Sequence, residues 1–370
     1  MFAANRIACP PRATVPASRR ARPASRARSR ATAVPRAESD ASSSSGSSSD
    51  PATAARPAPK LACPICLQPF PSSTTCACPT CARDFPVERG VADLCLDARG
   101  AAGAYKEPGL GKSGTKLFQS DLIASAYENG WRQSFAWAGF PGEEDEARYA
   151  LDYMRDAAAG GVILDVSCGS GLFSRRFASS GVFSHVVASD FSESMLRQAR
   201  SYCEEDPALR SAMQPTARDA PSNSNAPSGD RTGDGWDTKL TFVRADVGRL
   251  PFATASLDAV HAGAAMHCWP SPSAAVAEIS RVLKPGGVFV ASTFLDPTAM
   301  LGDALGGDDA VQPLSALFRD SGVGTGGAFN QFWSERELRD LTTGMCGLEG
   351  FERRRSRQFI FFRVNKPAAR

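Results

Sequence analysis

The sequence predicts an α/β protein built on a Rossmann-like parallel sheet, and three stretches support this. The apolar run Val162–Val166 is followed by a turn of small residues and by a helical pattern that begins at Leu172. Residues 186–190 predict a second strand and residues 240–246 a third, and each ends in a carboxylate. A strand, a glycine turn and a helix open nucleotide-binding βαβ units, so we expect a ligand crevice at the carboxyl ends of these strands.

The turn and the two carboxylates suit a nucleoside ligand. Gly169 and Gly171 let the backbone turn sharply and approach a ligand closely. Asp190 lies 19 residues after Gly171, where an acid can accept hydrogen bonds from both ribose hydroxyls. Asp246 would lie along the same crevice. Taken singly, the turn is also compatible with a plain strand-to-helix connection, and each acid with a helix N-cap.

Three stretches resemble the class I S-adenosylmethionine-dependent methyltransferases: residues 127–133 (YENGWRQ), 165–171 (DVSCGSG) and 261–270 (HAGAAMHCWP). The similarity spans about residues 118 to 365. It is closer still to a plant and algal group of chloroplast methyltransferases, some of them found on plastoglobules. The resemblance implies a Rossmann-like, seven-stranded class I methyltransferase sheet over residues 118–366, with S-adenosyl-L-methionine as the cofactor.

The resemblance also implies roles for single residues. Asp190 would hold the ribose, Asp246 would meet the adenine amine, and Gly169 and Gly171 would face the methionine part. It implies further cofactor contacts from Asp165, Ser167, Val247 and Ala264. Ser167 stands where the superfamily often has its first glycine, and a small polar residue should fit there. The turn lacks the third glycine of the dinucleotide fingerprint, which favours S-adenosylmethionine over NAD.

The charge of the chain is distributed unevenly. The 370 residues have a net charge of +3, but residues 1–37 hold nine arginines and no acid. The remaining 33 basic and 39 acidic residues leave about −6, so the folded part is not typical of a nucleic-acid binder. Residues 1–59 are predicted to be a transit peptide and disordered linker, which indicates the chloroplast, either stroma or plastoglobule. A basic tail on an acidic surface, or a mitochondrial address, is the alternative.

Two CxxC pairs separated by eleven residues predict a structural zinc site, with Cys63, Cys66, Cys78 and Cys81 as ligands. Cys76 is a rival ligand with a worse spacing, and disulfides are the alternative. We expect a zinc-binding knuckle over residues 60–90 and a connector over residues 91–117. On this reading Cys63→Ser should release the metal while cofactor binding by the main domain persists.

Several further elements follow from local patterns. Residues 118–159 look helical and would form either a lid over the crevice or a packing face. Helices are expected at 192–205, 274–283 and 334–343, the second stopped by Lys284-Pro285-Gly286-Gly287 and the third opened by a capping box. Strands are expected at 256–261, 288–294, 348–354 and 358–364, with the last two antiparallel. Residues 206–239 predict a disordered insertion, and no run is apolar for the ~18–20 residues that a membrane span needs.

The predicted chemistry is methyl transfer to a small-molecule or lipid-like acceptor, such as an isoprenoid or quinone. Such a displacement mainly requires alignment and exclusion of water. His267 is the first candidate for polar contact with the acceptor, and a packed histidine is the alternative. The competing functions are an RNA base methyltransferase of the ribosomal RNA guanine type and a non-catalytic S-adenosylmethionine-binding protein. We expect a monomer with no transmembrane segment and with peripheral plastoglobule association.

Overall fold

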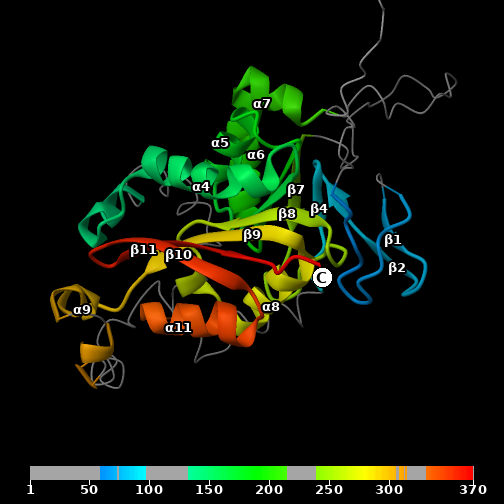
Figure 1. The fold of residues 1–370 in the computed structure, drawn as a ribbon. Helices are drawn as coiled ribbons and strands as arrows, with labels where there is room; N and C mark the ends of the chain where they lie inside the picture. Colours follow the sequence, from blue (N-terminus) through cyan, green and yellow to red (C-terminus); the bar gives the residue numbers. More distant parts are fainter. Residues whose placement is uncertain are drawn as a thin grey trace, which may run out of the picture. The chain divides into compact units, whose positions relative to one another are not determined.

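The computed structural model describes residues 59–72, 75–96, 132–214, 239–305, 308–311, 313–314 and 331–369. Within these residues nine strands form one sheet in the order β10-β11-β9-β8-β5-β6-β7-β4-β3, while β1 and β2 form a hairpin of their own (Figure 1). The strands are β1 (Cys76–Cys78), β2 (Arg83–Phe85), β3 (Val87–Glu88), β4 (Val91–Asp93), β5 (Val162–Val166), β6 (His185–Asp190), β7 (Leu240–Arg244), β8 (Leu257–Ala262), β9 (Leu283–Phe294), β10 (Glu349–Ser356) and β11 (Phe359–Asn365). The Rossmann-like α/β fold is confirmed: β5 to β11 supply seven strands between residues 118 and 366, as expected there, but β3 and β4 extend the sheet to nine.

The centre of the sheet is parallel and buried on both faces. β5 pairs with β6 and β8, and β6 pairs with β7, all in parallel. Ile163 packs into one core, whereas Leu164 and Val166 pack into the other, because successive side chains of a strand point to opposite faces. This parallel arrangement brings the carboxyl ends of β5, β6, β7 and β8 to one edge of the sheet.

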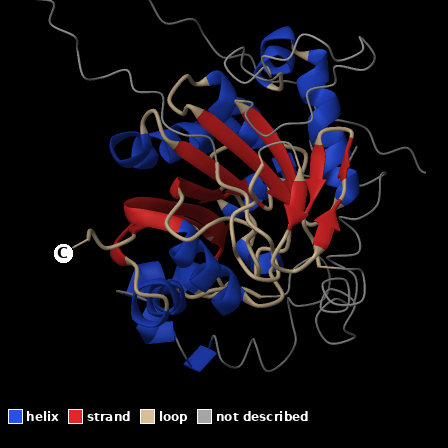
Figure 2. Ribbon diagram, turned by 90° about the vertical axis from the view of Figure 1, so that its right-hand side faces the viewer, coloured by secondary structure: helices blue, strands red, loops and turns tan. Residues whose placement is uncertain are grey.

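Helices cover both faces of the sheet (Figures 1 and 2). Apolar side chains of α4, α5, α6 and α7 pack on one face, and those of α8 and α11 pack on the other. The helices are α4 (Glu143–Ala158), α5 (Leu172–Ser179), α6 (Glu193–Glu205), α7 (Pro207–Ala212), α8 (Pro272–Val282), α9 (Ala299–Leu305) and α11 (Glu335–Arg339), with shorter or irregular helical segments η3 (Arg132–Ala138), η4 (Met266–Cys268), η5 (Asp308–Val311) and η6 (Asp340–Met345). None of the described helices is both long and apolar enough to cross a membrane.

The two extra strands come from the end of the cysteine-rich segment. β4 pairs with β7 in parallel, and β3 pairs with β4 in antiparallel. Residues 91–93, placed by the sequence in a connector, therefore extend the sheet. The buried side chains of Leu61, Phe85 and Leu94 belong to the same apolar core as those around β7. A three-residue strand has no local signature of its own, since it is stabilised by the neighbouring strand to which it adds.

Two further segments differ from expectation in their boundaries. The helical pattern of 118–159 is interrupted by Gly139 and Gly142, whose φ angles are +95° and +99°, so that η3 and α4 are separate; residues 118–131 lie outside the described residues. The predicted insertion begins later than residue 206, because α7 forms first. Asp206 caps α7 by accepting hydrogen bonds from the N–H groups of Ala208 (2.8 Å) and Leu209 (3.4 Å). Residues 215–238 are outside the described part of the chain.

The predicted helix caps at Ser192 and Ser334 and the antiparallel final strands are confirmed, whereas the expected turn at 284–287 is wrong, because these residues belong to β9. Ser192 caps α6 by accepting from the Met195 N–H, and Ser334 and Glu337 form the capping box of α11. β10 and β11 are antiparallel and lie at the edge of the sheet beyond β9. β9 begins at Leu283, ahead of the expected start at residue 288. The predicted transit peptide, residues 1–58 of the 1–59 segment, lies outside the described residues.

Candidate functional site

The turn after β5 has an unusual backbone. Ser167, Gly169 and Gly171 all have left-handed φ angles, of 55°, 56° and 77°. A Cβ on Gly171 would lie 2.9 Å from the Ala199 Cβ, so glycine is required there for both conformation and space. Ser167 adopts the same region with a side chain, at a cost of about 1–2 kcal/mol. The Trp269 Nε1–H donates a hydrogen bond to the Ser167 Oγ at 3.0 Å, which holds the strained residue against the loop after β8.

Asp190 joins the turn to the next helix. Its two carboxylate oxygens accept hydrogen bonds from the Gly169 N–H and the Ser192 N–H, both at 2.8 Å. Burial, together with the nearby charge of Asp165, raises the pKa of Asp190 above its ordinary value of 3.8, while the two N–H donors oppose that rise. Each oxygen keeps a further lone pair, so the carboxylate can still accept from a ligand hydroxyl.

Asp165 lies behind the turn as a buried anchor. Its oxygens contact the His261 Nδ1 at 2.8 Å and accept from the Ser174 Oγ–H at 2.5 Å. Together with Ser167, it lines a small cavity that Gly263 closes from β8. A Cβ on Gly263 would lie 2.7 Å from the Phe173 ring and 3.0 Å from the His261 ring. Among the described residues the buried His261 Nε2 has no hydrogen-bond partner. The sequence did not predict this Asp–His pair, because the two residues lie 96 positions apart.

Asp246 lies beside Asp190 at the same edge of the sheet. The Ala245 N–H donates to the Asp190 backbone oxygen at 3.1 Å, which ties the two strand ends together. The Asp246 Oδ1 accepts from the Gly248 N–H at 2.8 Å, and its backbone oxygen accepts from the Arg249 N–H at 2.9 Å. Val247, predicted to contact the cofactor, is buried within this turn.

Ala264 is supported by two polar residues that sequence reasoning missed. It has a left-handed φ of 49°, and its N–H donates to the Ser292 Oγ at 2.8 Å. The Ser292 hydroxyl in turn donates to Glu146 of α4, a carboxylate with no exposed surface. A glutamate in an acidic first helical turn normally faces solvent, so the sequence carried no signal for this relay.

His267 is packed, as the alternative interpretation held. It is 2% exposed, its Nδ1 lies 3.4 Å from the Thr293 Oγ1, and its ring meets the Phe294 ring edge-on at 4.9 Å between centroids. The neighbouring Cys268 has a pKa raised to about 12 by desolvation, so it is a thiol at neutral pH and a poor nucleophile. A direct catalytic role for His267 therefore remains a prediction without a supporting contact.

The four predicted zinc ligands converge. The Sγ atoms of Cys63, Cys66, Cys78 and Cys81 all lie within 4.8 Å of one another, and tetrahedral zinc thiolates require sulfurs about 3.8 Å apart. The rival Cys76 instead lies on β1 as a buried residue outside this group, and burial raises its pKa to about 12. Among the described residues no cysteines form a disulfide.

The two CxxC turns share one geometry. In each turn a backbone N–H donates to the first sulfur, from Ile65 to Cys63 and from Cys81 to Cys78, both at 3.4 Å. In each the residue after the second cysteine is left-handed: Leu67 has φ 62° and Ala82 has φ 47°. The N–H donor lowers the pKa of the Cys78 thiol to about 7. The pair of matching turns is suited to holding one metal ion between them.

Comparison with known proteins shows the family to which the parallel sheet belongs. Residues 164–291 match the family model described as a methyltransferase domain. One uncharacterized chloroplastic methyltransferase of Arabidopsis thaliana is 40% identical over 319 residues, which cover 83% of this chain and 79% of that protein. A second is 41% identical over 255 residues, covering 68% of this chain and 60% of that protein. A demethylmenaquinone methyltransferase of Clavibacter sepedonicus is 33% identical over 143 residues, covering 39% of this chain and 45% of that protein.

Proposed function

Because this chain belongs to the family of S-adenosylmethionine-dependent methyltransferases, we propose that it methylates a small-molecule or lipid-like acceptor, of isoprenoid or quinone type, in the chloroplast. The observation that carries the enzymatic part is the shared strand-end edge, where the left-handed glycine turn lies between Asp165 and Asp190. The acceptor class and the compartment go beyond family membership.

The residues at this edge fit the cofactor. We assign the Asp190 carboxylate to the ribose hydroxyls and the Asp246 carboxylate to the adenine amine. The turn at Gly169 and Gly171, with Asp165 and Ser167 behind it, would take the methionine part next to the small cavity. Val247 and Ala264 would line the two sides. The absence of a Cβ lets Gly171 pack closely on Ala199 of α6 and lets Gly263 lie against the Phe173 and His261 rings.

The bound cofactor supplies a methyl group on a positively charged sulfur, which leaves as a neutral thioether. The chain then has to align the acceptor and exclude water. In the described residues near the turn, His261 is held by Asp165 and His267 is packed on Phe294. Neither arrangement favours an exposed general base, which supports an acceptor that needs little deprotonation or loses its proton to solvent.

Apolar side chains support a lipid-like acceptor. Trp137 of η3 is 53% exposed and lies against Phe294, with ring centroids 6.3 Å apart. Phe294 also contacts His267, so this exposed aromatic surface adjoins the loop after β8 where we expect the acceptor. The similarity to a protein named for demethylmenaquinone, a quinone with an isoprenoid tail, supports the same class.

The compartment is proposed from two independent observations. The acid-free, arginine-rich start of the chain has the composition of a transit peptide. The two Arabidopsis relatives are named chloroplastic. We propose a monomer that acts in the stroma or peripherally on plastoglobules.

We also propose that the four cysteines hold one structural Zn²⁺. Four thiolates leave no open position for water, so the metal would stabilise and not catalyse. Elemental analysis of the purified full chain should give one zinc per molecule, lost in Cys63→Ser. A wild-type chain without zinc would contradict this assignment.

Incubation of the enzyme with methyl-labelled cofactor and either plastid lipid extract or plastid RNA tests the acceptor. We expect label in the lipid fraction. Label in RNA would replace the proposal by the RNA base methyltransferase. Cofactor binding with label in neither fraction would favour the non-catalytic binding protein. RNA is disfavoured because the basic residues flanking the cysteines, Arg83 and Arg89, are offset by Asp84 and Glu88.

A further inference from the structure

We propose that Arg249 is a positioning residue that couples the four-cysteine metal site to the Asp246 side of the cofactor site. Metal occupancy would then set the affinity for the cofactor. This inference rests on the proposed function, since it needs both the metal at the cysteines and the nucleoside at Asp246. It concerns the energetic coupling between the two sites, which is not part of either site's proposed role.

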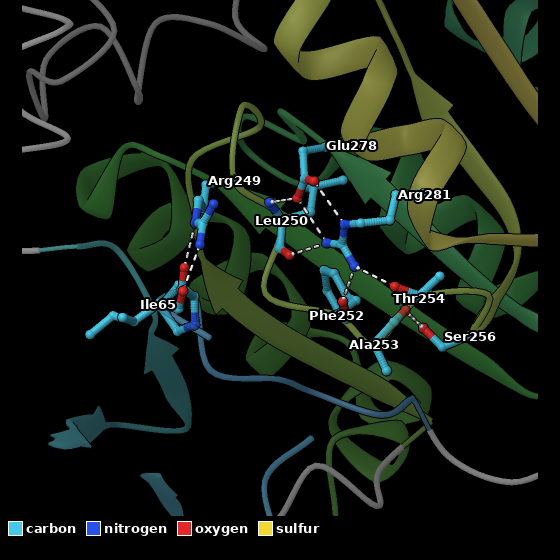
Figure 3. Close-up of polar contacts among 10 residues, drawn as sticks. Ile65, Arg249, Leu250, Phe252, Ala253, Thr254, Ser256, Glu278 and Arg281 are labelled. Carbon is cyan, nitrogen blue, oxygen red and sulfur yellow. Dashed lines mark hydrogen bonds and ion pairs between the residues drawn. The ribbon is translucent and has the colours of Figure 1, made fainter. Parts of the chain in front are cut away.

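The guanidinium of Arg249 binds the first CxxC turn directly (Figure 3). Its Nε donates to the Pro64 backbone oxygen at 2.5 Å, and its Nη2 donates to the Ile65 backbone oxygen at 2.6 Å. Pro64 and Ile65 are the two residues between Cys63 and Cys66, so their carbonyls are aimed by the turn that carries two of the four sulfurs. A forked donor on two fixed acceptors is geometrically demanding.

The other end of the same residue shapes the cofactor turn. The Arg249 N–H donates to the Asp246 backbone oxygen, and the Gly248 N–H between them donates to the Asp246 carboxylate. Arg249 is therefore part of the turn that orients the proposed adenine contact. A shift of the Arg249 side chain should therefore change the position of Asp246, three residues earlier in the turn.

The segment after Arg249 has a second support that does not involve the cysteines. On α8, Arg281 donates to the backbone oxygens of Leu250 and Phe252, both at 2.8 Å. Glu278 accepts from the Leu250 N–H and pairs with Arg281 (Figure 3). This support reaches residues 250–252, directly after the turn at 246–249. At the turn itself, the side chain of Arg249 makes the contacts to the metal-binding segment.

Backbone hydrogen bonds also join the segment before Cys63 to the segment after Arg249. The Ala62 N–H donates to the Pro251 oxygen at 2.8 Å, and the Ala253 N–H donates to the Lys60 oxygen at 3.1 Å. This short pairing leads straight into Cys63. Without metal, the four thiols are joined only by weaker contacts such as the one between the Cys66 and Cys78 sulfurs (3.6 Å), so we expect the Pro64 and Ile65 carbonyls to be held less firmly while the pairing at 60–62 remains.

These contacts argue against the expected independence of the cysteine unit. The sequence suggested that loss of metal would leave cofactor binding intact, as for two domains joined by a connector. A shared sheet, a shared core and the Arg249 fork instead predict coupling. Such coupling is reciprocal: if zinc tightens cofactor binding, the cofactor must tighten zinc binding by the same factor.

The test uses the full chain, zinc-loaded or made metal-free with a chelator under reducing conditions. Calorimetry measures the affinity for S-adenosylhomocysteine in both forms, and chelator competition measures zinc affinity with and without that ligand. Arg249→Met is compared with wild type and with Arg336→Met. The control removes an exposed arginine of α11 that pairs with Asp340.

For wild type and for the control we expect zinc removal to weaken S-adenosylhomocysteine binding roughly 10-fold, with the same factor for zinc affinity. In Arg249→Met both factors should fall below about 3-fold, because the fork is gone. A residue that merely supports folding would lower both affinities and leave the coupling factor unchanged.

Each contrary result is distinct. A wild-type chain that binds no zinc overturns the proposed metal site and the coupling with it. Equal ligand affinity with and without zinc overturns the coupling alone, as does undiminished coupling in Arg249→Met. If the metal-free chain loses its circular dichroism, the zinc affinities decide: S-adenosylhomocysteine must tighten zinc binding by a larger factor in Arg336→Met than in Arg249→Met, and equal factors overturn the proposal.

Discussion

Asp190 ends β6 and Asp246 lies in the turn after the neighbouring strand β7, but different parts of the chain hold them in place. The carboxylate of Asp190 accepts hydrogen bonds from Gly169 and Ser192, which lie 21 and 2 residues away in the sequence. The turn that carries Asp246 is fixed by the carbonyls of Pro64 and Ile65, separated from Arg249 by 185 and 184 residues. The Asp190 side of the proposed cofactor site is thus held within the β5–α5–β6 unit and the start of α6, whereas the Asp246 side adds contacts from a segment far away in the sequence.

We expect the largest effect of a single substitution on ligand affinity at Asp190. Asp190→Asn should weaken S-adenosylhomocysteine binding by about 1–3 kcal/mol, the value of a hydrogen bond to a charged acceptor. Calorimetry on zinc-loaded and metal-free protein checks this. Because Asp190 is supported without the cysteines, the loss should be the same in both forms. A loss of affinity that disappears on zinc removal would show that Asp190, like Asp246, depends on the cysteine segment.

The Asp246 side of the proposed cofactor site should be sensitive to the loss of contacts from α8. Arg281→Met removes the donors to the Leu250 and Phe252 oxygens and the ion-pair partner of Glu278, which keeps its hydrogen bond from the Leu250 N–H. We expect the free energy of unfolding to fall by about 1–2 kcal/mol, with weaker ligand binding. Thermal denaturation and calorimetry measure the two effects. Zinc content should stay at the wild-type level, and loss of zinc would show that α8 supports the cysteine turns as well.

The raised pKa of Asp190 predicts a pH dependence that Asp246→Asn should leave intact. The proposed contact with the ribose uses the ionised carboxylate, so ligand affinity should fall as the pH is lowered through the raised pKa, by at most about tenfold per pH unit. Calorimetry from pH 7 downward measures it, and Asp190→Asn should abolish it. For stability the sign is opposite: a raised carboxyl pKa contributes stability below its ordinary value of 3.8 that is lost as the pH rises through the folded-state pKa.

The smallest effect is expected for Ser167→Gly, because two local contributions to stability oppose each other there. Ser167→Gly relieves the left-handed strain but removes the acceptor for Trp269, so unfolding free energy should change by less than about 1 kcal/mol. Ser167→Ala keeps the strain and leaves the indole N–H unpaired, and should cost about 1–3 kcal/mol. Chemical denaturation of the pair measures both. Equal values would mean that the backbone of Ser167 is not strained in solution.

Several features were predictable because their causes are local. An apolar run before small residues predicted β5 and its turn, and the capping patterns at Ser192 and Ser334 predicted the starts of α6 and α11. The paired CxxC spacing predicted the cysteines that converge. In each case the residues that cause the structure lie within a few positions of one another, where their spacing can be read directly.

The sequence by itself therefore determined where the main strands lie along the chain, the glycine turn after β5 and the four converging cysteines. The tertiary structure alone decided that β4 adds to β7, that Glu146 supports Ala264 through Ser292, that His267 packs on Phe294, and that Arg249 binds the first cysteine turn. These contacts join segments far apart in the chain, and a side chain's sequence neighbours say nothing about which distant backbone it will meet. Burial and hydrogen bonding of this kind are properties of the packed fold.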